Sequence, residues 1–115
     1  MTFNEFANKY VGKIYSFREF DCEHLVIDGL KSIYDISVNK LTDEHFIECK
    51  KSDALFFACE NTDGTQCHVG LYKSGTYIHS VGSPHSEGQV FAHTSSFFNR
   101  VFVKQYSKVR FYKWR

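Results

Sequence analysis

Three widely separated residues, Cys22, His68 and His79, have the side chains that nucleophilic catalysis by a thiol requires. Such catalysis needs a base within hydrogen-bonding reach of the thiol and a third group that orients the base. Cys22 follows Asp21, a residue type that caps helices, so the thiol is expected in a first helical turn, where free N–H groups and the helix dipole favour thiolate. The alternative is a buried cysteine on an apolar helix face, and position alone leaves both readings open.

The two histidines lie in neighbouring segments, 68–72 and 76–81, that are joined by a turn at Ser74 and Gly75. In an antiparallel hairpin the start of one strand faces the end of the next, so the two imidazoles are expected side by side on one face. The alternatives are a solvent-facing histidine at a strand end for His68 and a partly buried polar side chain for His79.

The elements that position these residues begin with helices. Thr2 and Glu5 form a capping box before an apolar stripe that ends at Gly12, which predicts a helix over 2–11. Residues 13–20 are expected to form a connecting loop. An apolar face predicts a second helix over 22–34, and a weaker pattern predicts a third helical turn from Thr42 or Asp43 to about Lys50.

From Ser52 onward the sequence is typical of strands separated by turns. A hairpin, a third strand, a surface loop, a fourth strand, a short helix capped by Thr94 or Ser95, and a last strand are predicted, in this order, over 54–72, 76–81, 82–88, 89–92, 94–100 and 109–114. Helices first and strands second predict an α+β domain in which the helices pack on one face of an antiparallel β-sheet.

Length and composition agree with one domain covering residues 1–115. Hydrophobic residues make up 43% of the chain, which excludes a disordered protein. Fourteen basic against thirteen acidic residues give a net charge of +1, so no overall field attracts nucleic acid or membrane. Neither a membrane span nor a signal peptide is predicted, so the chain is expected to be cytoplasmic as synthesised, with its four cysteines as thiols.

Two other chemistries are less well supported by the sequence. Zinc donors are present, His93 among them, but no Cys-x-x-Cys and no His-x(3–5)-His pair occurs, and no cofactor is predicted. The segment 104–115 mixes basic and aromatic residues as a nucleic-acid-binding strand does. An amphipathic edge strand with its basic face outward explains this segment better, so no nucleic-acid partner is predicted.

Four segments of the chain together resemble the NlpC/P60 superfamily of papain-like cysteine peptidases; they are 20–26, 52–56, 68–72 and 77–79. The resemblance covers residues 5–82 well. It implies a papain-like α+β fold with Cys22 as nucleophile, His68 as base and His79 as the residue that orients the base. By the same resemblance, Tyr15 helps to form the oxyanion site.

The sequence departs from the usual family pattern beside the nucleophile. Glu23 and His24 follow Cys22 in place of small residues, and only seven positions separate Tyr15 from Cys22. This compact form is similar to members encoded by tailed phages and prophages.

The resemblance implies hydrolysis of an amide bond in peptidoglycan stem peptides. The first alternative is a phage or prophage tail-assembly or interaction domain with little or no hydrolysis, partnered by phage tail or secretion-apparatus proteins. Such a chain would be virion-associated or delivered to the cell wall. The second alternative is an acyltransferase or a deamidating toxin, because the same three residues can catalyse any acyl transfer.

Overall fold

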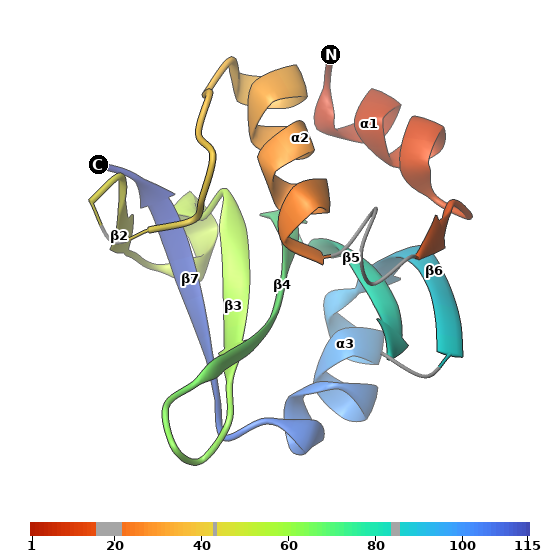
Figure 1. The fold of residues 1–115 in the computed structure, drawn as a ribbon, viewed down its shortest axis with the longest axis vertical. Helices are drawn as coiled ribbons and strands as arrows, with labels where there is room; N and C mark the ends of the chain where they lie inside the picture. The colour runs from red at the N-terminus through yellow and green to blue at the C-terminus, as the bar shows by residue number, and fades with distance from the viewer. Residues whose placement is uncertain (16–21, 43, 84–85) are drawn as a thin grey trace.

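The computed structural model describes residues 1–15, 22–42, 44–83 and 86–115. In chain order its elements (Figure 1) are α1 (Phe3–Tyr10), β1 (Ile14–Tyr15), α2 (Cys22–Tyr34), β2 (Phe46–Glu48), η1 (Lys51–Asp53), β3 (Phe56–Glu60), β4 (Gln66–Lys73), β5 (Thr76–Ser83), β6 (Ser86–Thr94), α3 (Ser95–Val101), η2 (Val103–Gln105) and β7 (Lys108–Trp114). Among the described residues, no helix is long and apolar enough to cross a membrane.

The two N-terminal helices form where their apolar stripes predict them. The Thr2 hydroxyl accepts a hydrogen bond from the Glu5 N–H at 3.1 Å, and the Thr2 N–H donates to the Glu5 carboxylate at 2.9 Å. This capping box satisfies N–H groups that a helix start leaves unpaired. Helix α2 has the predicted bounds, whereas its predicted cap, Asp21, lies outside the described residues.

The strands form one seven-stranded sheet in the order β1-β6-β5-β4-β3-β7-β2, and every pair is antiparallel. The predicted hairpin of β4 and β5 is confirmed, with Gly70 opposite His79. Its turn places Ser74 and Gly75 at φ values of 49° and 85°, a region that glycine adopts without steric cost. The sheet therefore brings the two histidine-bearing strands together as the sequence predicts.

The sheet separates two hydrophobic cores, because successive side chains of a strand point to opposite faces. Phe56 and Ala58 of β3 belong to the core beneath α1 and α2, whereas Phe57 and Cys59 belong to a second core with Phe98 of α3. Figure 1 shows α1 and α2 next to each other and α3 apart from both. We call these the helical face and the aromatic face. The predicted packing of the N-terminal helices on one face of an antiparallel sheet is confirmed, and the short helix α3 lies on the other face.

Two predicted segments have a different structure. The third helical turn near residues 42–50 is wrong, because this segment contains β2, which pairs with β7. Phe46 of β2 is buried with ring contacts to Phe56 and Trp114, and these long-range contacts outweigh a weak helical pattern. The bounds predicted for the loop over 82–88 are also wrong, because β5 extends to Ser83 and β6 begins at Ser86.

Strands at the two ends of the chain also differ from expectation. The loop predicted over 13–20 contains β1, which pairs with β6 at one edge of the sheet. The C-terminal strand β7 was expected at an edge, but it lies between β3 and β2. Its Arg110 binds Glu60 and Glu48, each at 2.8 Å, so this basic side chain is paired within the sheet.

Candidate active site

Three histidines form a continuous hydrogen-bonded chain on the aromatic face. His68 Nε2 lies 2.9 Å from His79 Nδ1, and His79 Nε2 lies 2.8 Å from His93 Nδ1. His79 is opposite Gly70 and Phe91, so each partner histidine is its diagonal neighbour on an adjacent strand. Diagonal positions are within reach of long side chains on one face of a sheet. The prediction that His68 and His79 are neighbours is therefore confirmed.

Aromatic rings surround the histidine chain and bury its central member. His79 is fully buried, and its ring contacts those of Phe57, Phe98 and Phe102. The His68 ring contacts Phe57 and stacks parallel to Tyr106 at a centroid distance of 6.1 Å. The surroundings of both imidazoles are therefore apolar, and each ring is held in a defined orientation.

Burial disfavours the charged form of all three imidazoles. It lowers the pKa of His68 to about 4 and that of His93 below its usual range. The pKa of His79 falls to about 2, because burial is reinforced by the charges that His68 and His93 would carry. The three hydrogen-bonded imidazoles are therefore neutral in the resting protein, and together they accept one added proton far more easily than two.

The hydrogen bonds decide which nitrogen of His68 can act as a base. A neutral imidazole has one N–H and one acceptor nitrogen. Because His68 Nε2 is bonded to His79, its Nδ1 is the nitrogen left to receive a proton from a nucleophile, provided that Nε2 carries the hydrogen. This is the arrangement that a base and its orienting residue require.

Cys22 is the first residue of α2, is half-buried and packs against the core of the helical face. Helix α2 contacts both β4 and β5, the strands that carry His68 and His79. Burial raises the pKa of Cys59 and of Tyr106, and a charge on Cys22 adds to both shifts, so its thiol lies within electrostatic range of the two groups. Cys59 is opposite His68 in the strand register, and Tyr106 stacks on His68.

Cys59 and Tyr106 are therefore within electrostatic range of the thiol and also adjoin the predicted base. The expected separation of about 4 Å between the Cys22 sulfur and a ring nitrogen of His68 stays a prediction. Tyr15 lies in β1, where its backbone pairs with Gly88. Its side chain lies outside the described part of the chain, so its role in the oxyanion site stays an implication of the resemblance.

The other three cysteines have environments that oppose thiolate formation. Burial raises the pKa of Cys59 to about 12 and raises those of Cys49 and Cys67 above the usual thiol value. Cys67 is exposed, and its sulfur donates to the Cys59 carbonyl at 3.5 Å. Each of these thiols is therefore a poor nucleophile at neutral pH.

His93 and Tyr106 are functional candidates that the sequence analysis did not identify as such. His93 was considered only as a metal donor, and the strand that carries it was expected to end at residue 92. Alternation along that strand, with Phe91 and His93 two positions apart, is the signal that could have placed His93 on the face of His79. No such signal exists for Tyr106, which reaches His68 from the segment after η2.

Within the described ranges, no group of three or more His, Cys, Asp or Glu side chains is arranged to hold a metal ion. The three histidines share their nitrogens in pairs, so each bonded nitrogen points at another ring and not toward a common centre.

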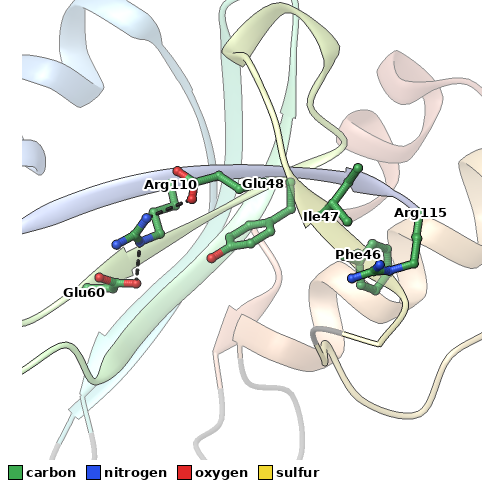
Figure 2. Close-up of a pocket in the computed structure, with 7 residues that line it drawn as sticks. Phe46, Ile47, Glu48, Glu60, Arg110 and Arg115 are labelled. Atoms are coloured by element: carbon green, nitrogen blue, oxygen red, sulfur yellow. Dashed lines mark hydrogen bonds and ion pairs between the residues drawn. The ribbon is translucent and has the colours of Figure 1, made fainter.

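A separate pocket lies on the helical face, where β3, β7 and β2 meet (Figure 2). It is lined by Phe46, Ile47, Glu48, Glu60, Arg110, Tyr112 and Arg115. Arg110 uses Nε for Glu60 and Nη1 for Glu48, and Figure 2 shows its guanidinium between the two carboxylates. This pocket contains none of the site residues predicted from the sequence.

Comparison with known proteins supports the architecture. Neither a protein-family model nor a curated protein sequence gives a significant match. Among solved structures, the NlpC/p60 domain of the peptidoglycan hydrolase SagA superposes with a TM-score of 0.55 at 21% sequence identity. The match covers 83% of this chain and 88% of that domain. The fold expected from the resemblance is thereby confirmed: this chain has the NlpC/P60 fold.

Proposed function

We propose that this protein is a cysteine peptidase or amidase that hydrolyses an amide bond in the peptide part of peptidoglycan. The observation that carries the proposal is the hydrogen bond between His68 Nε2 and His79 Nδ1, because it leaves His68 Nδ1 for the thiol. The position of Cys22 at the start of α2, beside residues that contact His68, supports the same assignment. The structural neighbour, a domain of a peptidoglycan hydrolase, supports the substrate class.

The proposed reaction has two steps. In the first, the Cys22 thiolate attacks the carbonyl carbon, and the His68 imidazolium, which took up the thiol proton, gives this proton to the leaving nitrogen as the C–N bond breaks. An acyl-enzyme thioester and a free amine result. In the second step His68 removes a proton from water, the hydroxide attacks the thioester, and the Cys22 thiolate leaves.

Two groups are proposed to stabilise the oxyanion of the tetrahedral intermediates. The backbone N–H of Cys22 lies at the start of α2, where the helix dipole favours negative charge. Tyr15 is the second candidate, from the resemblance. His79 would hold the His68 ring in place and stabilise its charged form.

The decisive experiment compares muropeptides released from purified sacculi by wild-type protein, Cys22→Ala and the matched control Cys67→Ala. Cys67 is an exposed thiol in the same part of the molecule, so its loss tests whether any effect is specific to Cys22. We expect mass spectrometry to find new peptide termini with wild type and Cys67→Ala, and none with Cys22→Ala. Release by Cys22→Ala would contradict the proposed nucleophile. No release by wild type would favour the tail-assembly or interaction domain.

A further inference from the structure

We infer that His93 is a positioning residue that sets the direction of hydrogen bonding through His79 to the base His68. This inference rests on the proposed function, in which His68 removes the thiol proton. It concerns a residue beyond the nucleophile, the base and the orienting residue that the resemblance implies.

Contacts with neighbouring aromatic rings fix the orientation of the His93 ring. His93 is half-buried at the end of β6, and its ring stacks on Phe97 of α3 at a centroid distance of 4.4 Å. Phe91 and Phe102 stack on it at 5.1 and 5.4 Å, with interplanar angles of 12° and 30°. These contacts restrict rotation of the ring and keep its Nδ1 directed at His79 Nε2, 2.8 Å away.

The bond to His93 decides the tautomer of His79. Both of its nitrogens are bonded to imidazoles, and a neutral ring can donate through only one of them. If His93 Nδ1 accepts, the hydrogen of His79 lies on Nε2, and its Nδ1 is then an acceptor for the N–H of His68 Nε2. That arrangement leaves His68 Nδ1 unprotonated, as a base must be.

His93 prevents the opposite arrangement of hydrogens on His79 and His68. If the hydrogen of His79 moved to Nδ1, this N–H would face His68 Nε2, which would then have to accept and carry no hydrogen. The hydrogen of neutral His68 would then lie on Nδ1, where it blocks uptake of the thiol proton. Because His79 is fully buried among aromatic rings, an unpaired Nε2–H is costly, and loss of His93 favours this inactive arrangement.

The same hydrogen bonds act on the charged form of His68. When His68 becomes an imidazolium, its Nε2–H becomes a stronger donor to His79 Nδ1, and the next bond in the chain is polarised in the same direction. A chain with all donors oriented from His68 toward His93 therefore stabilises the imidazolium that thiolate formation requires.

The test uses the chain of residues 1–115 and three variants of it. His93→Leu removes the acceptor, and His93→Asn places an amide oxygen near the position of Nδ1. His45→Leu is the matched control, because His45 stacks on Trp114 at the end of β7 and has no role in the site. For each protein, two-dimensional ¹⁵N NMR reports the tautomers of His68 and His79, and iodoacetamide reports the alkylation rate of Cys22 across pH.

In wild type and His45→Leu we expect the hydrogen on Nε2 of both His68 and His79. In His93→Leu we expect a shift of His68 toward the Nδ1–H tautomer and about tenfold slower alkylation of Cys22 at pH 7, the loss that one hydrogen bond explains. His93→Asn should restore the rate to within about twofold of wild type. A general loss of packing would not be rescued in this way.

Several outcomes would overturn the inference. A wild-type His79 with its hydrogen on Nδ1 does so without any variant, even if His93→Leu fails to fold. Unchanged tautomers and rates in His93→Leu, or no rescue by His93→Asn, do so as well. Failure of the proposed function is distinguishable, because tautomers that shift as expected support the role of His93 even where wild type releases no muropeptides from sacculi.

Discussion

The two faces of the sheet are built from different side chains and make different contributions to the site. The helical face is mainly aliphatic beneath α1 and α2, with Leu25, Val26 and Leu30 fully buried. The aromatic face contains the three histidines among phenylalanine and tyrosine rings, beneath α3 and η2. The proposed nucleophile is carried by the first face, and the proposed base with its two neighbouring histidines belongs to the second.

This difference shows how the two kinds of core suit two tasks. Aliphatic packing holds a helix against the sheet and thereby places the start of α2. Planar rings hold imidazoles in fixed orientations, and burial among them favours the neutral form. The site therefore depends on both cores, and damage to either one should have distinguishable consequences.

The largest expected effect is the loss of stability when one buried side chain is truncated on each face. Phe57 and Leu30 are both fully buried, on the aromatic and the helical face respectively. Phe57→Ala should reduce the free energy of unfolding by about 3–5 kcal/mol and Leu30→Ala by about 2–5 kcal/mol, measured by denaturant titration. Because the Phe57 ring contacts His68 and His79, only Phe57→Ala should change their NMR signals. Equal changes in both variants would contradict independent roles of the faces.

The second effect is acid sensitivity that originates on the aromatic face. In the folded protein burial lowers the pKa of His68 to about 4 and of His79 to about 2, whereas unfolded histidine titrates near 6.5. Between these values the unfolded chain binds more protons than the folded chain. The stability that the neutral imidazoles contribute is therefore fully present above about pH 6.5 and decreases as the pH falls toward 4. Each such histidine contributes a slope of up to about 1.4 kcal/mol per pH unit.

Denaturant titrations at several pH values measure this slope, and His79→Gln should reduce it relative to wild type. The control is His45→Gln, which lies outside the histidine chain; a reduction by His79→Gln no larger than that by His45→Gln would contradict the assignment. A wild-type stability that stays constant between pH 7 and pH 4.5 would show that the imidazoles are not buried in the neutral form.

The third effect compares the thiols. Burial raises the pKa values of Cys49, Cys59 and Cys67, so few of these thiols are ionised at neutral pH. We expect limiting iodoacetamide at pH 7 to modify Cys22 at least about tenfold faster than Cys67, the exposed thiol. Peptide mass mapping measures the order of modification. Earlier modification of any other cysteine would count against Cys22 as the nucleophile.

The smallest effect concerns Glu23, which follows the nucleophile. Its side chain is exposed, so water and salt screen its influence on the neighbouring thiol. Glu23→Ser should shift the pH profile of Cys22 alkylation to lower pH by only a few tenths of a unit. A clear shift to higher pH would indicate that Glu23 supports the site, for example by organising His24 or a neighbouring loop.

Local patterns predicted the elements whose causes are local. The capping box of Thr2 and Glu5, the apolar stripe of α2 and the Ser74–Gly75 turn each depend on residues a few positions apart. The neighbourhood of His68 and His79 followed from the same turn, because a hairpin fixes which residues of its two strands are close.

What the tertiary structure decided depends on contacts between distant residues. Strand β2 exists because Phe46 is buried against Phe56 and Trp114, and β7 lies inside the sheet because β2 covers its far edge. His93 joins the histidine chain because β6 pairs with β5 beyond its own predicted end at residue 92. The sequence by itself determined the local elements and one pair of histidines. Only long-range strand pairing, whose partners no local pattern specifies, decided that a third histidine completes the chain.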